Sequence, residues 1–187
     1  MAAPYPRHLL DQARHLVTQG QQRPRQVNLR RGVSSAYYAL FHLLAQDAAR
    51  AFVPKSDPGL RMLLPRVCVH EEMATACRTF TSRGPLPAVL QQIYPNLTIP
   101  TLLDGIAQAF IDLQKARHDA DYATHREWTR TMALTEVERA EQAFTDWDKI
   151  RPRGPKAAAQ VGLSAQDCEA ARLFLAWLLF QRKLQGR

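Results

Sequence analysis

The residues best suited to chemistry gather in and just after one short stretch of the chain, residues 116–122. Five side chains there are candidate catalytic groups: Arg117, His118, Asp121, Tyr122 and His125. A guanidinium can clamp a phosphate through its planar fork of donors, and a histidine exchanges protons near neutral pH. These residue types therefore suit work on a phosphodiester. The alternative is a salt-bridge cluster, in which Arg117 pairs with Asp119 or Asp121 and joins helix ends.

A second polar group lies on a predicted long helix that covers residues 26–52. Its members recur at spacings of three and four and so share one helix face: Arg31, Ser34, Tyr38 and His42. Such a stripe is either a buried hydrogen-bond network or a binding site. We favour the network for Ser34 and for the adjacent Tyr37 and Tyr38. We take Arg30, Arg31 and His42 as candidate contacts to nucleic acid.

The charge of the chain favours a polyanionic partner. The net charge is +8, and residues 1–66 hold ten Lys or Arg against three Asp, a balance of +7. A field of this kind attracts RNA, DNA or acidic proteins. An arginine-rich composition that merely reflects a GC-rich genome is the alternative.

Helical periodicity runs through the whole chain and predicts an all-α fold. Apolar residues recur at spacings of three and four, and no segment alternates as a strand does. We expect helices over residues 5–18, 26–52, 60–80 (interrupted by Pro65), 88–94, 101–118, 134–150 and 164–184. Residues 119–131 should form a partly helical connection. Two capping pairs are predicted, Thr135 with Glu138 and Ser164 with Asp167.

The predicted organisation is a helical domain over residues 1–150, a linker rich in Pro, Gly and Lys over residues 151–163, and a C-terminal helix over residues 164–187. The last helix is apolar around most of its circumference, so something must cover it. It folds back on the domain, or it packs against a second protomer or another partner. This face is the reason to expect a homodimer.

Two segments resemble the signatures of the HEPN family: RRGVSSAYYALFH over residues 30–42 and ARHDADY over residues 116–122. His70 is a weaker match, in the helix between them. The order and spacing agree over roughly residues 9–144. The resemblance implies an up-down helical bundle, here with an additional C-terminal helix, and a role on or near RNA.

In catalytic members of that family, an arginine supports the scissile phosphate, and a histidine separated from it by four to six residues assists proton transfer. The RNA 2′-hydroxyl is the nucleophile, no metal is needed, and two sites usually meet across a homodimer interface. Here seven residues separate Arg117 from His125. Seven is one more than the family spacing. In function, the resemblance implies a metal-independent toxin-like or defence-associated ribonuclease. The alternative is a non-catalytic module that binds nucleic acid or partners another protein, such as a nucleotidyltransferase.

The cysteines and the longest apolar run argue against disulfides, a metal site and a membrane span. The three cysteines show no CxxC spacing, and Cys68, His70 and Cys77 match no standard zinc pattern. We expect neither a disulfide framework nor a metal site, and no cofactor. The longest apolar run, residues 173–180, is too short to cross a bilayer. The expectation is a cytoplasmic protein that does not bind membranes.

Overall fold

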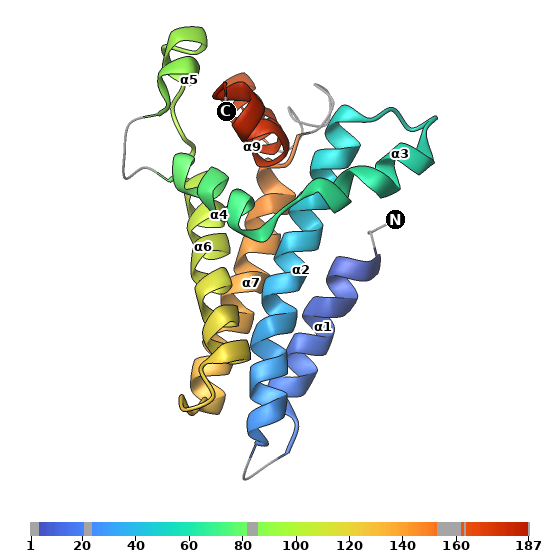
Figure 1. The fold of residues 1–187 in the computed structure, drawn as a ribbon, viewed down its shortest axis with the longest axis vertical. Helices are drawn as coiled ribbons and strands as arrows, with labels where there is room; N and C mark the ends of the chain where they lie inside the picture. Colours follow the sequence, from blue (N-terminus) through green and yellow to red (C-terminus); the bar gives the residue numbers. More distant parts are fainter. Residues whose placement is uncertain (1–3, 21–23, 82–85, 153–161, 163, 187) are drawn as a thin grey trace. The chain divides into compact units, whose positions relative to one another are not determined.

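A computed structural model describes residues 4–20, 24–81, 86–152, 162 and 164–186, and within these ranges the fold is all-α with no strand. The elements, labelled as in Figure 1, are α1 (Pro4–Thr18), α2 (Gln26–Phe52), α3 (Pro58–Leu63), a 3₁₀ turn η1 (Leu64–Val67), α4 (His70–Thr79), α5 (Ala88–Ile93), α6 (Thr101–Tyr122), α7 (Arg130–Ile150) and α9 (Ala165–Leu184). Every described helix is too short or too polar to cross a bilayer. The all-α class predicted from the sequence is confirmed by the helices and the absence of strands in the described residues.

The chain divides into two compact units. Unit 1 comprises Met1–Leu43 and Ala109–Phe144, and unit 2 comprises Leu44–Gln108 and Thr145–Arg187. Helices α2, α6 and α7 each contribute one portion to each unit. The C-terminal helix α9 belongs to unit 2. The predicted linker lies mostly outside the described residues.

In unit 1, α1 packs closely against the first part of α2. A Cβ on Gly32 would lie 2.4 Å from Val17 Cγ1 and 3.2 Å from the Ala13 carbonyl oxygen, so only glycine permits this approach. Val17 and Ala13 are fully buried there. The contact fixes the rotation of α2, and with it the direction in which the neighbouring Arg31 points.

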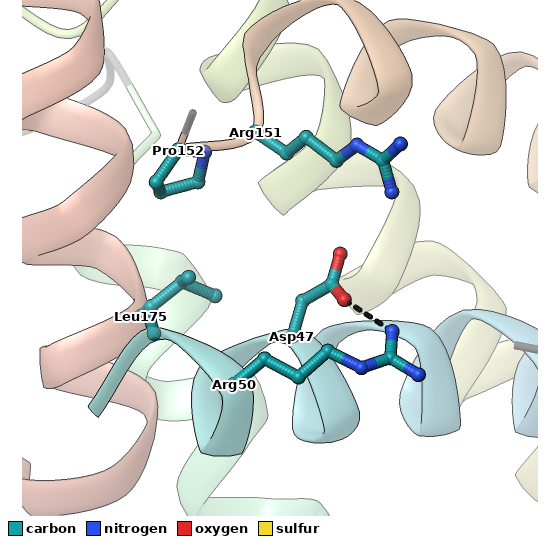
Figure 2. Close-up of a pocket in the computed structure, with 6 residues that line it drawn as sticks. Asp47, Arg50, Arg151, Pro152 and Leu175 are labelled. Atoms are coloured by element: carbon teal, nitrogen blue, oxygen red, sulfur yellow. Dashed lines mark hydrogen bonds and ion pairs between the residues drawn. The ribbon is translucent and has the colours of Figure 1, made fainter. Parts of the chain in front are cut away.

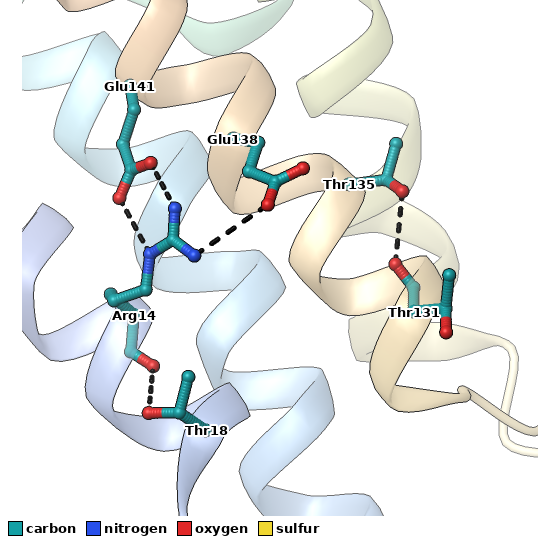
Figure 3. A network of polar contacts seen from close by, with 6 residues as sticks. All are labelled: Arg14, Thr18, Thr131, Thr135, Glu138 and Glu141. Carbon is teal, nitrogen blue, oxygen red and sulfur yellow. Dashed lines mark hydrogen bonds and ion pairs between the residues drawn. The ribbon is translucent and has the colours of Figure 1, made fainter.

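A charged network joins α1 to α7 in the same unit (Figure 3). The Arg14 guanidinium binds both carboxylate oxygens of Glu141 and lies 3.7 Å from Glu138. The hydrogen bond to Glu141 raises the pKa of Arg14, against a lowering by burial. Further along, Arg139 Nη1 lies 3.0 Å from Asp112 Oδ2 and ties α7 to α6. Guanidinium–carboxylate pairs therefore connect several helices of unit 1.

Unit 2 is centred on aromatic rings and one buried carboxylate. Phe174 of α9 lies 5.3 Å from the ring of Phe80 and 6.1 Å from that of Trp147, in edge-to-face arrangements. Asp47 accepts a 2.9 Å hydrogen bond from Trp147 Nε1 and a 2.8 Å bond from Arg50. The carboxylate is thereby satisfied although it is buried.

The broad apolar face of α9 is largely covered within unit 2. Helices α4 and α9 pack together, and the buried side chains of α9 are Ala170, Ala171, Phe174, Leu175, Trp177, Leu178 and Gln181. Only Phe180 and Leu184 remain among the exposed large apolar residues of this helix. Of the predicted alternatives for this helix, the structure shows folding back onto the same chain, against α4. The apolar face of α9 therefore does not by itself require a second protomer.

Several helices begin or end at other residues than the sequence predicts. The capping role of Thr135 and Glu138 is wrong, because α7 begins one turn earlier. Thr129 Oγ1 accepts from the Met132 backbone N–H at that helix start, and Thr135 donates to the Thr131 carbonyl instead. Helix α6 runs four residues past the predicted end at residue 118. The Ser164–Asp167 capping box is confirmed.

The segment 60–80 divides where Pro65 was expected to interrupt it. It contains α3, η1 and α4, with Pro65 in the 3₁₀ turn. Helix α3 and η1 contain no buried residue. Leu60, Met62, Leu63 and Val67 are accordingly all exposed.

Candidate functional site

The candidate site lies in unit 1, where the end of α6 meets the first part of α2. An open pocket of about 500 Å³ is lined by Val27, Arg30, Arg31, Ser34, Tyr38, Ala120, Asp121 and Tyr122. The stripe on α2 and the polar stretch at the end of α6 were predicted separately. The fold brings them together, about ninety residues apart in the chain.

Arg117 is anchored on three sides. Its Nη2 donates a 2.9 Å hydrogen bond to the Tyr38 hydroxyl, and its Nε lies 2.8 Å from Asp121 Oδ2. Its guanidinium also lies over the rings of Tyr38 and Tyr122, at 5.5 and 5.7 Å. Burial lowers the pKa of Arg117, but Tyr38, Asp121 and Tyr122 raise it, and the pKa lies above its ordinary value. The side chain is therefore a permanent cation with a fixed direction.

Asp121 is neutralised on both of its oxygens. Oδ1 accepts a 2.6 Å hydrogen bond from Ser34, which is buried, and Oδ2 faces Arg117. The predicted pairing of Arg117 with Asp121 is present, whereas Asp119 pairs with Arg126 instead. Both oxygens of the Asp121 carboxylate are therefore engaged by groups of the protein. Asp121 orients Arg117.

Arg30 holds the end of α6. Its Nη1 donates to the Ala120 carbonyl at 2.7 Å. Its Nη2 donates to three more carbonyls, those of Ala123 (3.1 Å), Thr124 (3.2 Å) and Arg126 (2.6 Å). The Ala120 carbonyl belongs to the last turn of α6, where the helix leaves carbonyls unpaired and its dipole favours a cation, and the other three carbonyls belong to the turn that follows. Although Arg30 lines the pocket, its terminal donors are engaged with this backbone.

The turn after α6 is tied down by a second clamp. Gln26 donates to the Trp128 carbonyl at 2.8 Å and accepts from the Trp128 backbone N–H at 3.0 Å. Arg126 lies over the indole ring of Trp128 at 5.0 Å and pairs with Asp119. The backbone that carries His125 is thus held to the start of α2. No pattern in the sequence predicts this clamp, because Gln26 and Trp128 belong to no recognisable motif.

The three candidate histidines have different surroundings. His118 is exposed and lies 5.0 Å from the ring of Tyr122. His125 is exposed on the turn, and neither residue contacts Arg117 among the described interactions. His42 lies outside the pocket lining, half-buried against Tyr5 at 5.1 Å, and burial lowers its pKa. His42 therefore lies next to Tyr38, with ring centroids 6.4 Å apart, but does not itself line the pocket.

A second pocket, of about 310 Å³, lies in unit 2 and contains none of the predicted site residues. Figure 2 shows Arg50 and Arg151 on either side of the Asp47 carboxylate. Asp47 already binds Trp147 and Arg50, and Arg151 Nη1 lies 3.6 Å from Asp148. The charges of this pocket are therefore paired within the chain. Among the described residues, no group of three His, Cys, Asp or Glu is arranged to hold a metal ion.

The pocket of unit 1 retains a positive charge. Arg30 and Arg31 line it, and Asp121, its one lining carboxylate, pairs with Arg117 beside the pocket. Its geometry suits an anionic ligand held by fixed donors. Comparisons with protein-family models, with curated proteins and with solved structures found no match to this chain.

Proposed function

We propose that the protein is a HEPN-like RNA-binding protein and that RNA occupies the cationic pocket of unit 1. The observation that carries the proposal is the charge of this pocket. Its single carboxylate, Asp121, is neutralised by Arg117 and Ser34, so the charges of Arg30 and Arg31 are not cancelled. Phosphate groups are the natural ligands of such a site, and the excess charge of residues 1–66 adds to the attraction.

Metal-independent RNA cleavage is the second candidate, favoured by two exposed histidines close in sequence to a fixed arginine. Arg117 would stabilise charge on the phosphate. His118 or His125 would act as general acid or base, a role that contributes about 10²- to 10⁴-fold, and Tyr122 would orient the substrate. Arg117 is already bound to Tyr38 and Asp121. This geometry favours binding over cleavage.

Protein partners form a further part of the proposal. A homodimer is expected for either candidate function. A partner such as a nucleotidyltransferase would make the protein a non-catalytic interaction module. The exposed apolar side chains of α3 and η1 support a protein contact of this kind, because a monomer seldom exposes so many together.

One experiment separates binding from cleavage. The purified protein is incubated with an end-labelled single-stranded RNA in EDTA, and both the retained complex and the product ends are measured. We expect binding that weakens steeply between about 50 and 200 mM salt. Products ending in a 2′,3′-cyclic phosphate, abolished by Arg117→Ala in a protein that remains helical, would establish the ribonuclease. Absence of any complex at low salt would refute both candidates.

A further inference from the structure

Arg30 and Arg31 line the pocket, Arg117 contacts three of its lining residues, and the three arginines differ in what they are free to bind. Arg30 donates to four backbone carbonyls, one in the last turn of α6 and three in the turn that follows it. Arg117 is held by the Tyr38 hydroxyl and by Asp121. No hydrogen bond or ion pair engages Arg31 in the described part of the chain. Although the family resemblance points to Arg117, the arginine available to a ligand is Arg31.

Arg31 is well placed to receive a phosphate. It is exposed, and it lines the pocket one turn of α2 before Ser34 and two before Tyr38. Its rotation about the helix axis is fixed by the contact of the next residue, Gly32, with α1. A guanidinium with five unused donors binds phosphate oxygens in pairs, which a lysine cannot do.

Tyr122 supplies a flat surface at the same pocket. Its side chain is 63% exposed, although aromatic rings are usually covered. The Arg117 guanidinium lies 5.7 Å from the ring, and the His118 ring lies 5.0 Å away. These neighbours support the ring while most of its surface remains open. An exposed, supported ring beside a cation is the arrangement on which unpaired bases stack.

We propose that Arg31 and Tyr122 form a nucleotide subsite in which Arg31 binds a backbone phosphate and Tyr122 stacks on the adjacent base of single-stranded RNA. This inference rests on the proposed RNA-binding function and gives it a substrate class. The pocket volume of about 500 Å³ falls in the range of sites for small ligands. A base within a duplex is already stacked on both faces, so Tyr122 selects against paired strands. Arg30 and Arg117 are then positioning residues that hold α6 in place.

The test is fluorescence anisotropy with three labelled 12-nucleotide probes: single-stranded oligouridine, the same backbone without bases, and an RNA duplex. Arg31→Ala should weaken binding of oligouridine about tenfold and lower the salt slope by about 0.7, the contribution of one phosphate on a single strand. Arg31→Lys should recover part of the loss. Lys115→Ala, which removes an exposed cation of α6 outside the pocket lining, should change affinity less than about twofold.

Tyr122→Leu should weaken oligouridine binding about five- to tenfold and leave the abasic probe unaffected, whereas Tyr122→Phe should bind like the wild type. Circular dichroism confirms that each variant is folded. If the wild type binds RNA but Arg31→Ala and Tyr122→Leu bind equally well, the subsite is wrong while the proposed function stands. If Arg117→Lys loses affinity and Arg31→Ala does not, the phosphate lies on Arg117. If the wild type binds no probe at low salt, both proposals fail.

Discussion

Charged side chains connect the helices of unit 1, whereas aromatic rings form the centre of unit 2. In unit 1, Arg14, Arg30, Arg117 and Arg139 each reach from one helix to another or to the turn beyond it. In unit 2, Phe174 packs with Phe80 and Trp147, and the apolar side chains of α3 stay exposed. Guanidinium groups form hydrogen bonds of defined geometry and so fix the orientation of the groups they bind, whereas aromatic rings stabilise a core through the apolar area they bury. The unit that positions donors is therefore the one with the candidate site.

The largest effect should come from the aromatic centre of unit 2. Phe174 is fully buried, and Phe180 on the same helix is 39% exposed. Phe174→Ala should lower the free energy of unfolding by about 3–5 kcal/mol, because it leaves a cavity between rings. Phe180→Ala should cost less than about 1 kcal/mol. Urea unfolding followed by circular dichroism measures both, and equal losses would contradict the contrast drawn between core and surface.

The close contact of α1 with α2 in unit 1 should be the next most sensitive feature. Gly32→Ala places a methyl group 2.4 Å from Val17 Cγ1, and valine is too stiff to move aside. We expect a loss of about 1–3 kcal/mol in thermal or urea unfolding. Gly105→Ala is the matched control, since its Cβ would meet nothing within 4 Å. It should stabilise α6 by about 0.5–1 kcal/mol. Two changes of the same sign would show that packing at Gly32 is not the cause.

A smaller, pH-dependent effect should come from His42. Burial among aromatic rings lowers its pKa, so the folded protein prefers the neutral imidazole. Below the usual histidine value of about 6.5, the unfolded chain binds a proton there more readily than the folded one. The free energy of unfolding should then fall as pH decreases through that value. His42→Phe should lose less stability between pH 7.5 and 5 than the wild type. Parallel pH profiles would contradict this account.

The smallest effect should come from the exposed face of α3. Met62 is 73% exposed, and Met73 of α4 is fully buried. Met62→Ser should change the free energy of unfolding by no more than about 0.5 kcal/mol, whereas Met73→Ala should cost about 2–5 kcal/mol. Both are measured by urea unfolding. A large loss for Met62→Ser would show that α3 contributes to the stability of unit 2 after all.

Much of the local structure could be predicted because it depends on residues close in the chain. The bounds of α2 follow from its apolar period between Pro24 and Pro54, and the start of α9 follows from the Ser164–Asp167 capping box. The end of α6 could not be predicted in this way. It extends to Tyr122, and the Ala120 carbonyl in its last turn is bound by Arg30, about ninety residues earlier in the chain. Phe52 continues the apolar spacing of α2 at its last residue, yet its side chain is exposed.

The sequence by itself determined the all-α fold, the helix faces and the residue types near the end of α6. These follow from periodicity and from side-chain chemistry, which are local properties. Only the tertiary structure decided which arginine is available. All three arginines carry the same guanidinium group. Backbone carbonyls at and after the end of α6 bind Arg30, and Tyr38 of α2 and Asp121 of α6 bind Arg117. Among the described residues, Arg31 alone of the three faces the pocket without such a contact. A guanidinium binds the acceptors that the fold brings within hydrogen-bonding distance. Most of these acceptors lie far away in the chain, so the residues next to an arginine in the sequence do not reveal them.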